Sequence, residues 1–131
     1  MKRKIKTYPL CEAVINNDMN GFNTLLDSDV DLEGTDYNGF TALMYAAYFG
    51  HFAMAKKLIE KGASIECKDS FGNTPLIRAC FRYSYNENGI EMIRLLISCG
   101  ANVNARNNAG ISPKSFAKTT QGFPEIDALK D

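Results

Sequence analysis

The residues that could do chemistry in this 131-residue chain are few and widely spaced. It has a single histidine, His51, and its four cysteines are Cys11, Cys67, Cys80 and Cys99. A zinc site needs about four converging nitrogen or sulfur ligands, yet no two of these cysteines form a C-x-x-C pair. A cysteine nucleophile would need His51 beside a thiol, and no glycine-rich phosphate loop is present. We therefore expect no enzyme activity, no metal site and no cofactor.

Charged side chains give only weak signals for a ligand. Lysine plus arginine and aspartate plus glutamate both number 15, so the net charge is zero and no nucleic-acid or acidic membrane partner is expected. The basic residues near the start are Lys2, Arg3, Lys4 and Lys6. They could contact phosphates, but a solubilising terminus is the favoured interpretation. The alternating acids Asp27, Asp29 and Asp31 could bind a cation weakly, although a solvated loop is favoured.

Length and hydropathy predict one domain, at residues 1–131, in the cytoplasm. No apolar run approaches the roughly 18 residues that span a bilayer, so no membrane association is expected. The first residues lack the apolar segment of a secretion signal. Without such a signal, four distant cysteines are most simply interpreted as reduced cytosolic thiols.

An internal repeat dictates which elements must position these residues. The glycines at positions 39 and 72 and the alanines at 13, 46 and 79 keep one constant spacing. In both series the next member, Gly110 or Ala117, comes five positions later than that spacing predicts. The period is about 33 residues, a length typical of stacked repeats, and one copy carries five extra residues at about 83–87. The predicted units are about 6–38, 39–71, 72–109 and 110–131.

Each unit predicts two short helices followed by a tight turn. Thr74 is a typical N-cap and Pro75 suits the first helical position. Gly62 and Gly100 are typical of the left-handed residue that follows a helix. The second helix carries one apolar stripe, at Met19, Phe22, Leu25 and Leu26, then Phe52, Ala55, Leu58 and Ile59, then Ile90, Ile93, Leu96 and Ile97, and finally Phe123, Ile126, Leu129 and Lys130.

The stretch "GFTALMYAAYFGHFAMAKKLIEKGASIECKD" resembles the ankyrin repeat, whose pattern is G-x-T-P-L-H-x-A, then G-H, then L-L-x-x-G-A-x-x-N. The resemblance covers about Tyr8 to Leu129 and implies an all-α ankyrin-repeat solenoid of about four helix-turn-helix units. In this family His51 would be structural and open the second helix. The family's other histidine is absent, with Cys11, Met44, Ile77 and Ser115 in its place. Its hydrogen bonds between repeats must be lost or replaced, so we expect modest stability.

The terminal units carry polar residues where inner units are apolar. Lys114 replaces the leucine seen at Leu43, and Asn16 replaces Phe49. A solenoid needs such polar outer faces at its ends. The pattern predicts two inner repeats between two capping repeats, which would make a complete protein.

Aromatic residues occupy positions that the repeat leaves variable. By the resemblance, these lie on the turns and inner helices of the concave face, where they would form a partner-binding surface. The candidate residues are Tyr37, Phe40, Tyr48, Phe49, Phe71, Phe81, Arg82, Tyr83 and Tyr85. Two alternatives remain: several of these rings pack on one another or under the next turn, and residues 83–87 are a neutral insertion.

The expected function is therefore non-enzymatic binding of another protein through the concave face, by a monomer. One alternative is an immunity or inhibitor protein that neutralises a toxin or enzyme. Another is a structural protein that self-associates through its aromatic residues.

Overall fold

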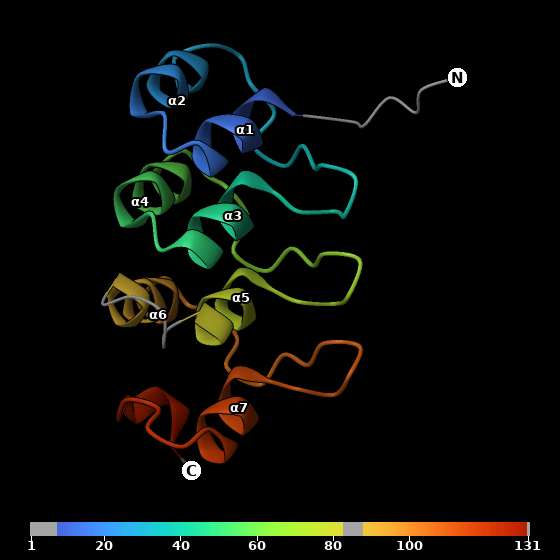
Figure 1. The fold of residues 1–131 in the computed structure, drawn as a ribbon, viewed down its shortest axis with the longest axis vertical. Helices are drawn as coiled ribbons and strands as arrows, with labels where there is room; N and C mark the ends of the chain where they lie inside the picture. The colour runs from blue at the N-terminus through green and yellow to red at the C-terminus, as the bar shows by residue number, and fades with distance from the viewer. Residues whose placement is uncertain (1–7, 83–87, 131) are drawn as a thin grey trace.

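The computed structural model describes residues 8–82 and 88–130, and in them seven α-helices form two parallel columns (Figure 1). The inner column holds α1 (Pro9–Ile15), α3 (Ala42–Phe49), α5 (Pro75–Arg82) and α7 (Pro113–Thr119). The outer column holds α2 (Met19–Leu26), α4 (Phe52–Glu60), α6 (Asn88–Ser98) and the short 3-10 helix η2 (Asp127–Leu129). Long loops, called fingers below, project from the inner column at about 34–40, 67–73 and 105–111 (Figure 1). The all-α solenoid is confirmed, and the predicted insertion at 83–87 lies outside the described residues.

Side-chain caps begin the inner helices where the sequence predicts them. The hydroxyl oxygens of Thr41 and Thr74 accept hydrogen bonds from the amides of Met44 and Ile77, at 3.2 and 3.3 Å. These bonds satisfy amides that have no partner within the first helical turn. The repeat thus restarts an inner helix once in each unit, at Ala42 and at Pro75.

The two end helices of the inner column begin differently. Ser112 and Ser115 form a reciprocal capping box at the start of α7. At α1 the N-cap residue Tyr8 makes no cap bond, and its hydroxyl instead donates to the carbonyl of Asp31. The first helix is therefore held by its unit's own outer loop.

The prediction of a second α-helix in the last unit is wrong. Only η2 forms there, because Gly122 has a positive φ of 79° and Pro124 restricts the residue before it to extended backbone. Ile126 and Leu129 are nevertheless buried. Apolar residues of this stripe therefore pack in the core although the predicted helix does not form.

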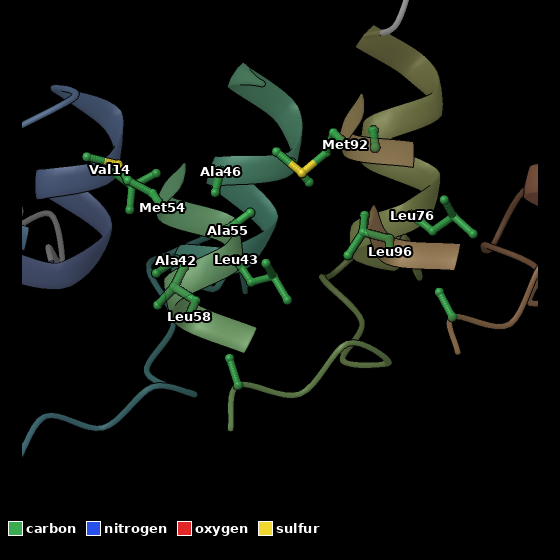
Figure 2. Close-up of a cluster of buried hydrophobic side chains, with 14 of the residues drawn as sticks. Val14, Ala42, Leu43, Ala46, Met54, Ala55, Leu58, Leu76, Met92 and Leu96 are labelled. Carbon is green, nitrogen blue, oxygen red and sulfur yellow. The ribbon is translucent and has the colours of Figure 1, made fainter. Parts of the chain in front are cut away.

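The core runs between the two columns along the whole stack (Figure 2). Small residues at Ala46, Ala47, Ala79 and Cys80 are fully buried, so adjacent inner helices approach closely, as the sequence predicts. The apolar stripe of each outer helix faces inward, with two of its four members buried. Two further buried residues, Met54 and Met92, were missed, although they occupy equivalent positions of two units. Among the described residues, none of the helices is long and apolar enough to cross a membrane.

Candidate protein-binding surface

One polar side chain organises the backbone of each finger. In the first finger, Asp36 Oδ1 accepts from the amides of Asn38 and Phe40, both at 3.0 Å. Asp69 Oδ1 makes the same two bonds in the second finger, at 2.8 and 3.0 Å, and Asn107 Oδ1 makes them in the third, at 3.0 and 2.9 Å. Each turn therefore closes on a side-chain acceptor and does not need a partner to order it.

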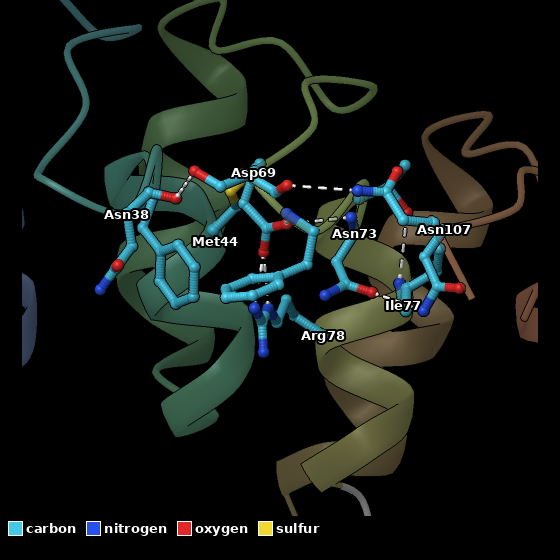
Figure 3. Close-up of polar contacts among 12 residues, drawn as sticks. Asn38, Met44, Asp69, Asn73, Ile77, Arg78 and Asn107 are labelled. Carbon is cyan, nitrogen blue, oxygen red and sulfur yellow. Dashed lines mark hydrogen bonds and ion pairs between the residues drawn. The ribbon is translucent and has the colours of Figure 1, made fainter.

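The second carboxylate oxygen of each aspartate bonds the finger to its inner helix. Asp69 Oδ2 accepts from Arg78 Nε at 2.9 Å and from Arg78 Nη2 at 2.6 Å (Figure 3). The Asp69 side chain is 0% exposed and that of Arg78 is 14% exposed, so this is a buried ion pair. The corresponding Asp36 Oδ2 accepts from the hydroxyl of Tyr45. Burial and this hydrogen bond raise the pKa of Tyr45.

Neighbouring fingers are bonded to one another. Ser70 donates twice to the carbonyl of Asn38, from its hydroxyl at 2.7 Å and from its amide at 3.2 Å. In the same way the amide of Asn108 donates to the carbonyl of Phe71 at 2.9 Å. Buried Met44 and Ile77 replace the family's histidine, and the fingers supply some of the hydrogen bonds between units. The three fingers form one ordered ridge.

Aromatic rings gather where the first finger meets α3 and α5. Phe40 and Tyr45 have ring centroids 5.1 Å apart, and the guanidinium of Arg78 lies over Phe40 at 4.4 Å. Phe49 stacks on Tyr45 at 6.1 Å and meets the edge of Tyr48 at 5.2 Å. The predicted residues Phe40, Tyr48 and Phe49 are therefore brought together, half-buried against each other.

Arg82 joins this group from the next unit. Its guanidinium lies 4.7 Å from the centroid of the Tyr48 ring, and its Nε donates to the Tyr48 carbonyl at 3.1 Å. A cation over an aromatic face is attracted by the ring quadrupole. Together with the Arg78–Phe40 contact, this contact ties α5 to the preceding unit.

The other predicted residues lie in different places. Tyr37 and Phe71 stand on the fingers and are 73% and 57% exposed. Phe81 packs edge-on against Phe116 of α7, with centroids 5.0 Å apart. Tyr83 and Tyr85 lie outside the described residues, so the structure does not place them.

Two members of this surface were missed from sequence. Tyr45 lies at the centre of the rings, and Ile15 on α1 is 41% exposed. The repeat holds a signal for Ile15, because Ile15, Tyr48 and Phe81 occupy equivalent positions in three successive units. One row of apolar residues therefore runs across three inner helices.

Burial shifts the pKa of the histidine and of two buried cysteines, whereas Cys99 is exposed. His51 begins α4 and stacks on Phe49 at 5.8 Å, and burial lowers the pKa of its imidazole. Burial raises the pKa of the Cys11 and Cys80 thiols to about 12. The four cysteines are unpaired, and residues 8–82 and 88–130 contain no cluster of three or more side chains suited to a metal.

Comparison with known proteins identifies the repeat. A family model of ankyrin repeats in three copies matches residues 10–107. The B-cell lymphoma 3 protein homolog of Mus musculus is 41% identical over 110 residues, which are 80% of this chain and 23% of the relative. An ankyrin repeat-containing protein of Schizosaccharomyces pombe is 30% identical over 102 residues, covering 77% of this chain and 45% of that protein.

A shorter match reaches a protein of another kind. The potassium channel GORK of Arabidopsis thaliana is 43% identical over 70 residues, which are 53% of this chain and 8% of the channel. The chain spans less than half the length of each of these three relatives.

Proposed function

This chain belongs to the ankyrin-repeat family, and we propose that it binds another folded protein through its fingers and inner helices. Ankyrin repeats are generally protein–protein interaction modules. The proposed surface, called the aromatic surface below, comprises Ile15, Tyr37, Phe40, Tyr45, Tyr48, Phe49, Phe71, Phe81 and Arg82, and on sequence grounds Tyr83 and Tyr85.

The observation that carries the proposal is the exposure of two large rings on fingers that are already ordered. Tyr37 and Phe71 are among the few large hydrophobic side chains exposed in the described part of the chain. Their fingers are held by side-chain caps and by bonds to the next finger, so exposure does not arise from loose loops. A preordered surface loses less conformational entropy on binding, and tyrosine is enriched among the residues that dominate interface energy.

Half-buried rings complete the proposed surface. Tyr48 and Phe49 are supported by each other and by Arg82, which fixes the orientation of the rings they present. An interface of standard size buries about 800 Å² on each partner. Three consecutive fingers with their inner helices can supply such an area.

The test begins by isolating the partner from the source organism with the tagged chain. Its affinity is then measured by calorimetry for wild type, for Tyr48→Ala and for the double variant Tyr37→Ala, Phe71→Ala. We expect each variant to bind at least about thirtyfold more weakly, which corresponds to about 2 kcal/mol for a central anchor. Lys56→Ala, an exposed change on the outer helix α4, is the matched control and should bind as wild type does.

Two results would contradict the proposal. Unchanged affinity in both aromatic variants would place the site elsewhere on the molecule. A partner that proved to be a second copy of the chain, seen as a dimer in light scattering of the pure protein, would replace binding of another protein by self-association. We expect a monomer.

A further inference from the structure

The carboxylates on the partner-facing side of the molecule are occupied by internal bonds. In residues 34–49, 67–82 and 105–119, which form the fingers and the helices α3, α5 and α7, the acidic residues are Asp36 and Asp69. Asp69 is buried against Arg78, and Asp36 accepts from two turn amides and from Tyr45. The Asp69 carboxylate is therefore paired with a cation, whereas the groups bonded to Asp36 are uncharged.

The acidic residues that border the fingers also accept hydrogen bonds. A carboxylate oxygen of Glu33 accepts from the amide of Ser64 at 3.0 Å, and one of Glu66 accepts from the amide of Asn102 at 2.7 Å. Both bonds join one unit to the next. Glu12 on α1 is exposed, but it lies in the first unit, before the fingers begin. Because a backbone amide is uncharged, Glu33 and Glu66 still place negative charge beside the first and second fingers, whereas residues 105–119, which form the third finger and α7, contain no acidic residue.

Positive charge accumulates on the same segments. Lys68 and Arg106 are exposed on the second and third fingers, at equivalent positions of the repeat. Arg82 is held over Tyr48, so its charge sits beside the rings of the aromatic surface. Lys114 and Lys118 on α7 continue the series toward the last unit.

Acidic residues concentrate instead near the two ends of the stack. Asp27, Asp29 and Asp31 are exposed in the loop that follows α2, and Glu125 and Asp127 are exposed beside η2. Among the described residues, the second and third fingers with α5 and α7 thus carry an excess of basic side chains. A separated charge of this kind steers partners of opposite sign onto one side and repels others.

We infer that the partner presents an acidic protein segment, with apolar or aromatic side chains among its carboxylates, to the second and third fingers and to the rings beside them. This inference rests on the proposed function and adds the chemical class of the partner. The carboxylates would face Lys68 and Arg106, while the apolar side chains would meet Tyr37, Tyr48 and Phe71. The contact would weaken as salt rises, because its charges lie at the surface.

The test uses defined probes and does not require the natural partner. A random copolymer of glutamate and tyrosine and a random copolymer of lysine and tyrosine are titrated into the chain, with a short DNA duplex as a third probe. We expect binding of the glutamate copolymer, decreasing with added salt, and no binding of the lysine copolymer. The double variant Lys68→Glu, Arg106→Glu should bind the glutamate copolymer roughly threefold to tenfold more weakly, as expected for surface charges.

A matched control changes net charge by the same amount elsewhere. Lys56→Glu with Lys61→Glu reverses two exposed lysines of the outer helix α4 and its C-cap and should leave affinity unchanged. Because Arg106 also donates to the Gly110 carbonyl at 2.7 Å, Lys68→Glu is tested alone as well, and circular dichroism checks the fold of each variant.

The possible outcomes separate this inference from the proposed function. Failure of the glutamate copolymer to bind, or equal weakening in both charge-reversal pairs, would overturn the acidic partner. Tighter binding of DNA with the same dependence on Lys68 and Arg106 would also overturn it, in favour of a phosphate backbone. None of these results bears on whether Tyr48→Ala weakens binding of the native partner. That separate measurement tests the proposed function.

Discussion

One side-chain position decides the conformation of each finger. Aspartate occupies it at Asp36 and Asp69, and asparagine occupies it at Asn107. All three use one oxygen to accept two turn amides. Only the aspartates have a second oxygen for the inner helix, whereas the Asn107 amide donates to Asn73 Oδ1 at 2.9 Å. One oxygen at this position therefore closes the turn, and the second oxygen, where the residue is aspartate, bonds to the inner helix.

The separate roles of the two oxygens predict the order of stability among variants of Asp69. Asp69→Asn keeps the turn acceptor but leaves Arg78 nearly buried without its charged partner, so we expect it to cost about 3 kcal/mol of the free energy of unfolding. Asp69→Ala loses the turn acceptor as well, so it should cost about 1 to 2 kcal/mol more than Asp69→Asn. Urea denaturation measures both. Asp36→Asn, which gives up only a tyrosine hydroxyl bond, is the control and should cost least; equal losses for Asn and Ala at position 69 would contradict the idea.

The thiols divide by burial. Only the thiolate attacks a disulfide reagent, and burial raises the pKa of Cys11 and Cys80 to about 12. We expect Cys99, which is exposed, to react first with Ellman's reagent in the native protein, and Cys11 and Cys80 to react only after unfolding. Mass spectrometry after alkylation should count four thiols without a reductant. Rapid reaction of all four in the native protein would show that the core opens readily.

The same pKa shifts predict how stability depends on pH. The thiols ionise near 9 in the unfolded chain but only near 12 in the folded one, so the unfolded state loses protons first. The stability from the protonated, buried thiols is fully present below pH 9 and is lost as pH rises toward 12, by up to about 1.4 kcal/mol per pH unit for each thiol. Urea denaturation at pH 8 to 10.5 measures the slope, and Cys80→Ala should make it shallower. An unchanged slope in Cys80→Ala would rule out that thiol as a source.

The helices and turns were predictable to the extent that short-range signals decide them. Thr74 caps its helix as predicted, and Thr41 and Ser112 do the same at equivalent positions, because a cap needs only a hydroxyl and the amide three residues later. The last outer helix was mispredicted because its apolar spacing is helical, while Gly122 and Pro124 break the backbone. Its apolar residues are still buried because they pack on the rest of the core. The spacing of these residues in the sequence therefore predicts their burial even where the helix does not form.

The candidate surface was predictable only in part. Exposure of Tyr37 and Phe71 follows from their place in a turn, which the repeat reveals. The stacking of Arg82 on Tyr48 and of Arg78 on Phe40 joins residues of successive units, and no local pattern announces it. The packing of Phe81 on Phe116 has the same origin. These contacts depend on the distance between successive units in the stack.

Contact between fingers predicts different costs for the same substitution at two glycines. Gly62 and Gly72 both have positive φ, at 99° and 77°, so alanine is strained at each by about 1 to 2 kcal/mol. A Cβ at Gly62 would meet nothing within 4 Å, but at Gly72 it would lie 2.9 Å from the amide nitrogen of Asn108. We expect Gly72→Ala to cost at least about 1 kcal/mol more than Gly62→Ala in thermal or urea unfolding. Equal costs would mean that adjacent fingers separate easily.

The molecule as a whole is a stack, and the main packing contacts among its described helices join each unit to its neighbours. α3 packs on α1, α4 and α5, and α5 packs on α3, α6 and α7. An inner unit therefore has two interfaces and a terminal unit has one (Figure 1). In such a linear array, stability is the sum of unit terms and interface terms, and the interfaces carry the cooperativity. The modest stability expected from the missing family histidine stays a prediction.

This arrangement predicts that matched core deletions differ in cooperativity as well as in stability. Leu76→Ala and Leu10→Ala remove the same side chain from fully buried sites on α5 and α1. Each should cost about 3 kcal/mol, within the range for leucine-to-alanine changes in cores. Leu76 lies in an inner unit, so its loss should lower the urea midpoint of the whole transition and leave the slope unchanged.

Leu10 lies in the first unit, whose single interface cannot hold it once weakened. That unit should then unfold at lower urea than the rest and reduce the slope of the main transition, which scales with the surface exposed. Circular dichroism gives both quantities, and hydrogen exchange locates the early opening at α1 and α2. A full slope for Leu10→Ala, with exchange uniform along the chain, would show that the interface between the first two units is strong enough to keep the stack cooperative from its first helix.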